Sequence, residues 1–151
     1  MARRQQEPSA KRNELPIAAL NAMRELYRRL DDEVAAVGVT CKGCGRCCRF
    51  ESSGLRLYLG PVEMALFSEG LPANAGNVRK ACPWLVEDRC SNRANRTIGC
   101  RTYFCGDEET DRLQDLHEAY LKESKRICER FDIAWEYAPL EAWVSGADAF
   151  A

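Results

Sequence analysis

The chain has 151 residues, enough for one domain with its own core, and nine of them are cysteine, about 6 per cent. That share is below the ~8–10 per cent of short disulfide scaffolds, and no apolar run approaches the ~20 residues of a membrane span. The net charge of −1 conceals an uneven distribution: +1 over residues 1–40, +5 over 41–105 and −7 over 106–151. Eight of the nine cysteines lie in the basic middle segment.

Residues 1–12 are basic and polar, and no apolar segment follows them as it would in a secretory signal. We therefore expect a disordered tail and a cytoplasmic protein that does not associate with membranes. In a reducing compartment, cysteines more often bind metal or carry out redox chemistry than form structural disulfides.

Residues 13–40 carry a helical pattern. Pro16 suits the first turn of a helix, and Gly38 is a natural end. Between them apolar side chains recur three and four residues apart: Leu20, Met23, Tyr27, Leu30, Val34 and Val37. This spacing predicts an amphipathic helix that packs on the rest of the domain. A coiled-coil dimer is a weaker alternative, because the pattern covers under three heptads.

The middle segment predicts short elements joined by loops. We expect a loop over 41–54, a strand over 55–59, a helix over 60–70, a hairpin over 82–90, and irregular structure or one helical turn over 91–106. Within the hairpin, Trp84 and Leu85 are expected to point inward.

A second long helix is predicted over 108–131. Its apolar face comprises Leu113, Leu116, Tyr120, Ile127 and Phe131. Trp135, Tyr137, Leu140 and Trp143 are expected to pack the segment 132–151 back onto the core. The predicted fold is mainly α, with irregular cysteine-rich loops and a short β element in one small domain. Its parts are a tail (1–12), a helix (13–40), a cysteine-cluster metal-binding domain (41–131) and a C-terminal packing tail (132–151).

The central motif is Cys41-Lys-Gly-Cys44-Gly-Arg-Cys47-Cys48. C-x-x-C turns let thiolates converge, and glycines supply the backbone angles that such loops use. Three cysteines two residues apart can hold three corners of a cubane iron–sulfur cluster, and they suit zinc equally. Cys47 and Cys48 are adjacent, so we expect their side chains to diverge, to serve different metals or to leave one outside the ligand set. A thioredoxin-like redox pair is less favoured, because the motif follows a helix rather than a strand.

The wider cysteine pattern resembles a known family. Cys41-x2-Cys44-x2-Cys47-Cys48 is followed by Cys82-Pro-x-Leu85, by Cys90, and then by Arg96 and Cys100-Arg101-x-Tyr103. This order is similar to the CxxCxxCC, or YkgJ-type, cysteine cluster family, which is described as a zinc- or iron-chelating domain. The resemblance spans about residues 41–131. It implies eight metal ligands, with Cys105 as a substitute for one of them: Cys41, Cys44, Cys47, Cys48, Cys82, Cys90, Cys100 and Cys128.

The chain departs from the family at three positions. Thr97 stands where the family often has proline, Arg93 occupies the region where an aromatic residue often follows Cys90, and Cys105 is an additional cysteine. Taken singly, Cys105 or Cys128 is as readily explained as a small buried apolar residue.

The resemblance implies a cysteine-rich metal-binding protein that chelates zinc or iron, the latter also as an iron–sulfur cluster. Arg96 and Arg101 are expected to lie behind the thiolates, where their positive charges offset an anionic centre. His117, the one histidine, is expected to face solvent or to be partly packed rather than to bind metal.

Two other functions are considered. A flagellin lysine methylase carries a similar cysteine motif, which keeps open an accessory or catalytic role in protein modification, although no glycine-rich cofactor loop follows a strand here. The +5 middle segment would also suit a module that binds an acidic protein partner or nucleic acid. Nucleic acid is the less expected partner, because no aromatic residues interleave the basic ones in an RNA-binding pattern.

Overall fold

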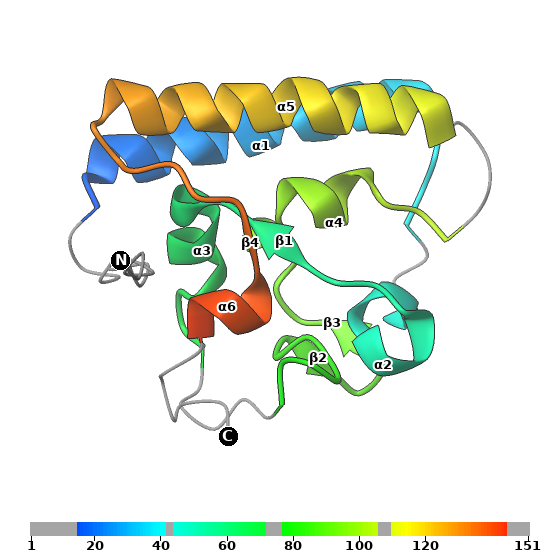
Figure 1. The fold of residues 1–151 in the computed structure, drawn as a ribbon. Helices are drawn as coiled ribbons and strands as arrows, with labels where there is room; N and C mark the ends of the chain where they lie inside the picture. Colours follow the sequence, from blue (N-terminus) through cyan, green and yellow to red (C-terminus); the bar gives the residue numbers. More distant parts are fainter. Residues whose placement is uncertain (1–14, 42–43, 72–76, 106–109, 145–151) are drawn as a thin grey trace, which may run out of the picture.

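The computed structural model describes residues 15–41, 44–71, 77–105 and 110–144 (Figure 1). The predicted N-terminal tail and the small-residue end of the chain lie outside these ranges. The described chain is mainly helical, with two short two-stranded sheets, which confirms the predicted fold class. Across these ranges, no helix has the length and apolar character that crossing a membrane requires.

Two long antiparallel helices, α1 (Ile17–Val37) and α5 (Thr110–Arg130), lie side by side along one edge of the molecule (Figure 1). Both predicted helices are confirmed. Gly38 ends α1 in the left-handed conformation with φ +88°, which glycine adopts without steric cost. The buried face of α1, which packs on α3, α4 and α5, comprises Ala19, Met23, Leu26, Tyr27, Leu30 and Val34.

Shorter elements fill the space below this helix pair. They are η1 (Arg46–Cys48), α2 (Phe50–Ser53), β1 (Tyr58–Leu59), α3 (Pro61–Phe67), β2 (Leu85–Val86), β3 (Arg89–Cys90), η2 (Arg93–Asn95), α4 (Ile98–Thr102), β4 (Ala138–Pro139) and α6 (Leu140–Val144). Helices α3 and α4 pack directly on the long helices. The cysteine-bearing loops are connected to α3 and α4.

The C-terminal segment folds back as predicted. Strand β4 pairs antiparallel with β1, and the Trp143 indole donates a hydrogen bond to the Leu59 carbonyl at 2.9 Å. Leu140 is fully buried beneath this contact. The strand predicted over 55–59 is shorter than expected, with two paired residues, because its partner strand is itself only two residues long.

The predicted hairpin is also present. Strands β2 and β3 are joined by Glu87 and Asp88, which both have positive φ angles, as a two-residue turn between twisted strands requires. Trp84 points inward, meets Phe67 edge to face and donates from its indole to the Phe67 carbonyl at 2.8 Å.

A buried carboxylate joins three helices at the centre of the fold. Glu63, in the first turn of α3, accepts hydrogen bonds from the backbone N–H of Ile98 at 2.7 Å and from the Tyr27 hydroxyl at 3.2 Å. It also accepts from the N–H of Gly60 at 3.1 Å, which caps its own helix. Burial raises the pKa of Glu63, and these donors act in the opposite direction.

The guanidinium of Arg101 is buried beside this carboxylate, with 3% of the side chain exposed. It donates to the carbonyls of Ala94 and Arg96, each at 2.7 Å, and forms an ion pair with Asp31 at 2.7 Å. Its charge also lies 4.2 Å from the centre of the Tyr27 ring. Arg101 thus fixes the segment around η2 to helix α1.

Replacing Arg101 tests this role. Arg101→Met leaves two backbone carbonyls without donors, and we expect it to lower the free energy of unfolding by about 3 kcal/mol. Asp31→Asn is the matched control and should cost about 1 kcal/mol or less, because Asp31 is half-exposed. Urea unfolding of both variants measures the difference. Equal, small losses in the two variants would show that the carbonyl contacts contribute little.

Candidate metal centre

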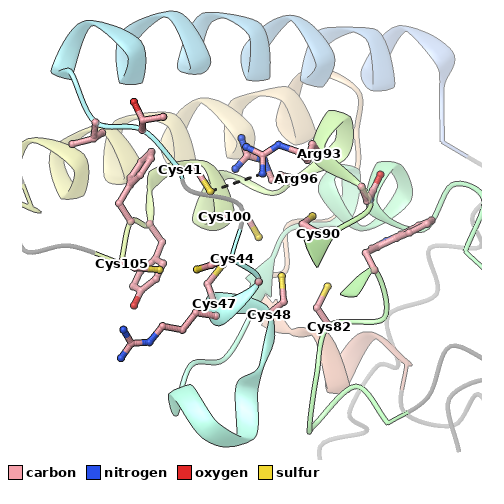
Figure 2. Close-up of a pocket in the computed structure, with 18 of the residues that line it drawn as sticks. Cys41, Cys44, Cys47, Cys48, Cys82, Cys90, Arg93, Arg96, Cys100 and Cys105 are labelled. Atoms are coloured by element: carbon pink, nitrogen blue, oxygen red, sulfur yellow. Dashed lines mark hydrogen bonds between the residues drawn. The ribbon is translucent and has the colours of Figure 1, made fainter. Parts of the chain in front are cut away.

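A cavity of about 610 Å³ lies below α4, and eight of the nine cysteines line it (Figure 2). The thiols come from the turn at 41–48, from the start and end of the hairpin segment, and from α4 and the residues after it. They are Cys41, Cys44, Cys47, Cys48, Cys82, Cys90, Cys100 and Cys105. Residues far apart in sequence are therefore gathered around one space, and none of the nine cysteines is in a disulfide.

The turn that carries four of these thiols is shaped by Gly45. This residue has φ +68°, and the N–H of Cys48 bonds to its carbonyl at 3.1 Å to form η1. A Cβ atom on Gly45 would overlap the carbonyl oxygen of Asp88 and lie 2.8 Å from the Leu85 side chain. The sequence predicted special backbone angles at Gly43 and Gly45. Gly45 has them, and Gly43 lies outside the described residues.

Polar contacts hold the hairpin segment against this turn. The N–H of Cys82 donates to the Cys48 carbonyl at 2.7 Å. Arg49 forms an ion pair with Asp88 in the hairpin turn and donates to the Cys44 carbonyl at 3.4 Å. These contacts bring Cys82 and Cys90, at the two ends of the hairpin segment, next to Cys48.

Cys48 is the centre of the thiol contacts. Its thiol interacts with those of Cys47, Cys82 and Cys90. These interactions raise the pKa of Cys48 well above the ordinary thiol value, and the interaction with Cys47 contributes most. The interaction with Cys48 lowers the pKa of Cys47 and of Cys90, each to about 6.

Cys47 and Cys48 both lie in the 3₁₀ turn η1 and both line the cavity, and each affects the pKa of the other. The expected divergence of their side chains stays a prediction. Within the described ranges no three His, Cys, Asp or Glu side chains form a group that could hold a metal ion as they stand.

Cys100 lies in the first turn of α4, deeper in the cavity wall. Thr97 caps this helix by accepting from the Cys100 N–H at 3.1 Å, and its hydroxyl contacts the Cys100 sulfur at 3.2 Å. Loss of hydration raises the pKa of Cys100 to about 12. Thr97, which departs from the family pattern, is therefore the residue that begins α4.

Two arginines face the thiols. Arg93 lies 3.9 Å from the Cys41 sulfur, and Arg96 lines the cavity and helps to lower the pKa of Cys47 and Cys90. The Nε atom of Arg96 is buried and has no hydrogen-bond partner among the described residues. Arg101, the other arginine expected near the thiols, is not among the residues that line the cavity. It donates a hydrogen bond to the Arg96 carbonyl.

The structure separates the two cysteines that the sequence left ambiguous. Cys105 lines the cavity, where its side chain points toward that of Cys44 (Figure 2). Cys128, on α5, is fully buried in the core that α1, α3, α4 and α5 share, and it is not among the residues that line the cavity. There, burial raises the pKa of Cys128 to about 11.

A smaller, mainly apolar cavity of about 290 Å³ lies behind the thiols. Cys47, Cys48, Cys82, Cys100 and Tyr103 line both cavities. The remaining wall is largely aromatic and apolar and includes Phe50, Leu57, Tyr58, Tyr137 and His117. As expected, His117 is partly packed. Its ring nitrogen lies 3.2 Å from the Thr102 hydroxyl, and burial lowers its pKa.

No family model, curated protein or solved structure matches this chain. What can be said of its chemistry therefore depends on the residues that surround the cavity.

The role of Gly45 can be isolated by a matched substitution. Gly45→Ala adds a methyl group that meets the hairpin, whereas Gly54 has a similar φ of +72° and open space around it. We expect Gly54→Ala to cost ~1–2 kcal/mol of stability from the backbone angle alone. Gly45→Ala should cost about 1–3 kcal/mol more from the steric conflict. Chemical unfolding of the two variants checks this, and equal costs would contradict the close packing at Gly45.

Proposed function

We propose that this chain is a cysteine-rich metal-binding protein in which Cys47, Cys48, Cys82 and Cys90 hold zinc or iron, the latter as an iron–sulfur cluster. The observation that carries the proposal is that these four thiols, from two distant parts of the chain, line one cavity, and the interactions of Cys48 with the other three support it. The resemblance to the CxxCxxCC family, in which all four positions have counterparts, agrees with this assignment.

The donor set suits these metals. A tetrathiolate zinc site has Zn–S bonds of ~2.3 Å, so its sulfurs lie about 3.8 Å apart, which is close to thiol hydrogen-bond contact. A cubane cluster also takes four thiolates. Hard cations such as magnesium and calcium prefer oxygen, which this set of residues does not supply.

Charge around the thiols also supports the proposal. Four thiolates on one Zn²⁺ leave a net charge of −2, and an oxidised cubane with four thiolates has the same charge. Arg93 and Arg96 face the thiols and offset that charge. The buried Nε–H of Arg96, which has no partner among the described residues, would find an acceptor in a metal-bound sulfur.

The proposed ligands come from two separate parts of the chain, so metal would couple to folding. Bridging the turn at 47–48 to the hairpin segment at 82–90 makes the binding free energy part of the folding free energy. Metal binding also releases thiol protons, so affinity should fall as the pH is lowered. Cys41, Cys44 and Cys100 line the same cavity outside this quartet. Cys128 lies in the helical core, and the proposal leaves it out.

Metal content of two serine variants tests the assignment. We expect protein purified without air to hold about one zinc per chain, or iron with visible absorption, and Cys48→Ser to lose most of it. Cys128→Ser is the matched control, because that residue is equally buried yet outside the cavity, and it should retain the metal. Elemental analysis and absorption spectra are the measurements. A second variant, Cys90→Ser, replaces a half-exposed member of the quartet, where a folding defect is a smaller concern.

Several outcomes would decide the matter. A colourless zinc protein would exclude the cluster version and keep the metal site. A folded, metal-free wild-type protein would overturn both versions. Equal metal content in wild type, Cys48→Ser and Cys90→Ser would overturn the assignment of the quartet.

The arginine beside the thiols gives an independent prediction. Arg96→Gln removes a positive charge that faces the proposed centre, and we expect metal affinity to fall about tenfold. Arg89→Gln is the control, since Arg89 is exposed on the hairpin and does not line the cavity. Competition with a chromophoric chelator measures both affinities. An equal loss in the two variants would point to the overall charge of the protein rather than to Arg96.

A further inference from the structure

We infer that Cys44 and Cys105 are a site of reversible disulfide formation at the edge of the cysteine-lined cavity. At the edge of the cavity the two side chains point toward one another, although 60 residues separate them in sequence (Figure 2). Neither belongs to the proposed metal quartet, so this inference goes beyond the proposed function and does not require it.

Exposure to solvent distinguishes this pair from the other thiols that line the cavity. Cys44 and Cys105 are the two exposed cysteines of the chain. Cys48 and Cys82 are buried, so an oxidant the size of a small peptide reaches them poorly. Susceptibility to oxidation follows access and thiolate character, and a reactive thiol beside a second, resolving thiol is the usual arrangement of a redox-sensitive site.

The local environment assigns different roles to the two thiols. A hydrogen bond from the backbone at Arg46 lowers the pKa of Cys44, which favours its thiolate. Partial burial and the neighbouring Cys44 raise the pKa of Cys105. These directions favour Cys44 as the attacking thiol and Cys105 as the resolving one.

The reaction is an exchange with a small-molecule disulfide such as glutathione disulfide. The Cys44 thiolate attacks one sulfur of the reagent, which forms a mixed disulfide and releases one glutathione thiolate. Cys105 then gives up its proton and attacks the Cys44 sulfur, which releases the second glutathione thiolate. The two protein thiols lose two electrons to the reagent, and their two protons pass to the two glutathione thiolates.

The product would link the turn at 44–48 to the segment that follows α4. Both segments line the cavity, so the covalent bond would fix one edge of it. A thiol reductant reverses the reaction, which makes the link sensitive to the redox state of the surroundings.

Peptide mapping of the full-length protein tests the inference. The reduced protein is treated with glutathione disulfide, alkylated, digested and examined by mass spectrometry. We expect the main product to contain one Cys44–Cys105 cross-link, so that alkylation labels two fewer cysteines than the nine of the reduced chain. Cys105→Ser should lose this cross-link, whereas Cys128→Ser should retain it.

A main cross-link among Cys47, Cys48, Cys82 and Cys90, or no intramolecular cross-link at all, would overturn the inference. An unchanged product in Cys105→Ser would overturn it as well. Metal content is measured on the reduced protein before oxidation, so failure of the proposed function is seen separately. A Cys44–Cys105 link in protein that never held metal would still support the redox site.

Discussion

The buried charge of Arg101 is the constraint on which the arrangement of the thiol segments depends. A guanidinium removed from water must find partners, and here they are two loop carbonyls, the Tyr27 ring and the half-exposed carboxylate of Asp31. One side chain from α4 therefore determines how the segment between Cys90 and Cys100 lies against α1. Glu63 acts in the same way from α3, since it accepts from the first N–H of α4.

The molecule thus combines a regular part with an irregular one. The helix pair α1 and α5 buries conventional apolar faces, while the cysteine segments have little regular structure and depend on particular polar contacts. The hydrogen bond between Cys82 and Cys48, the ion pair between Arg49 and Asp88, and the close packing at Gly45 each join parts of the chain that are distant in sequence. Such contacts position thiols accurately only while the helices on which these segments pack stay in place.

Sequence periodicity predicted the regular part well, because α1 and α5 are long and amphipathic and end at recognisable residues such as Gly38. The hairpin was also predictable from its local signals. The pairing of β1 with β4 was not, since two-residue strands leave no pattern in the sequence. For the site, the cysteine spacing pointed to the segments that line the cavity but not to the partition of the thiols. Cys105 and Cys128 differ in where tertiary packing puts them, which no local sequence pattern records.

The order of the thiols along the chain has a consequence for synthesis. The last cysteine that lines the cavity, Cys105, precedes the whole of α5 and β4. At ~5–20 residues per second, β1 would emerge from the ribosome about 4 to 16 s before its partner strand, some 80 residues later. In the later part of that interval, after Cys105 and before α5 is complete, all eight cavity thiols are already made while the apolar face of α1 still lacks the helix that covers it. The thiols of a newborn chain are therefore available to a metal ion or to an oxidant before the scaffold that holds them apart is complete.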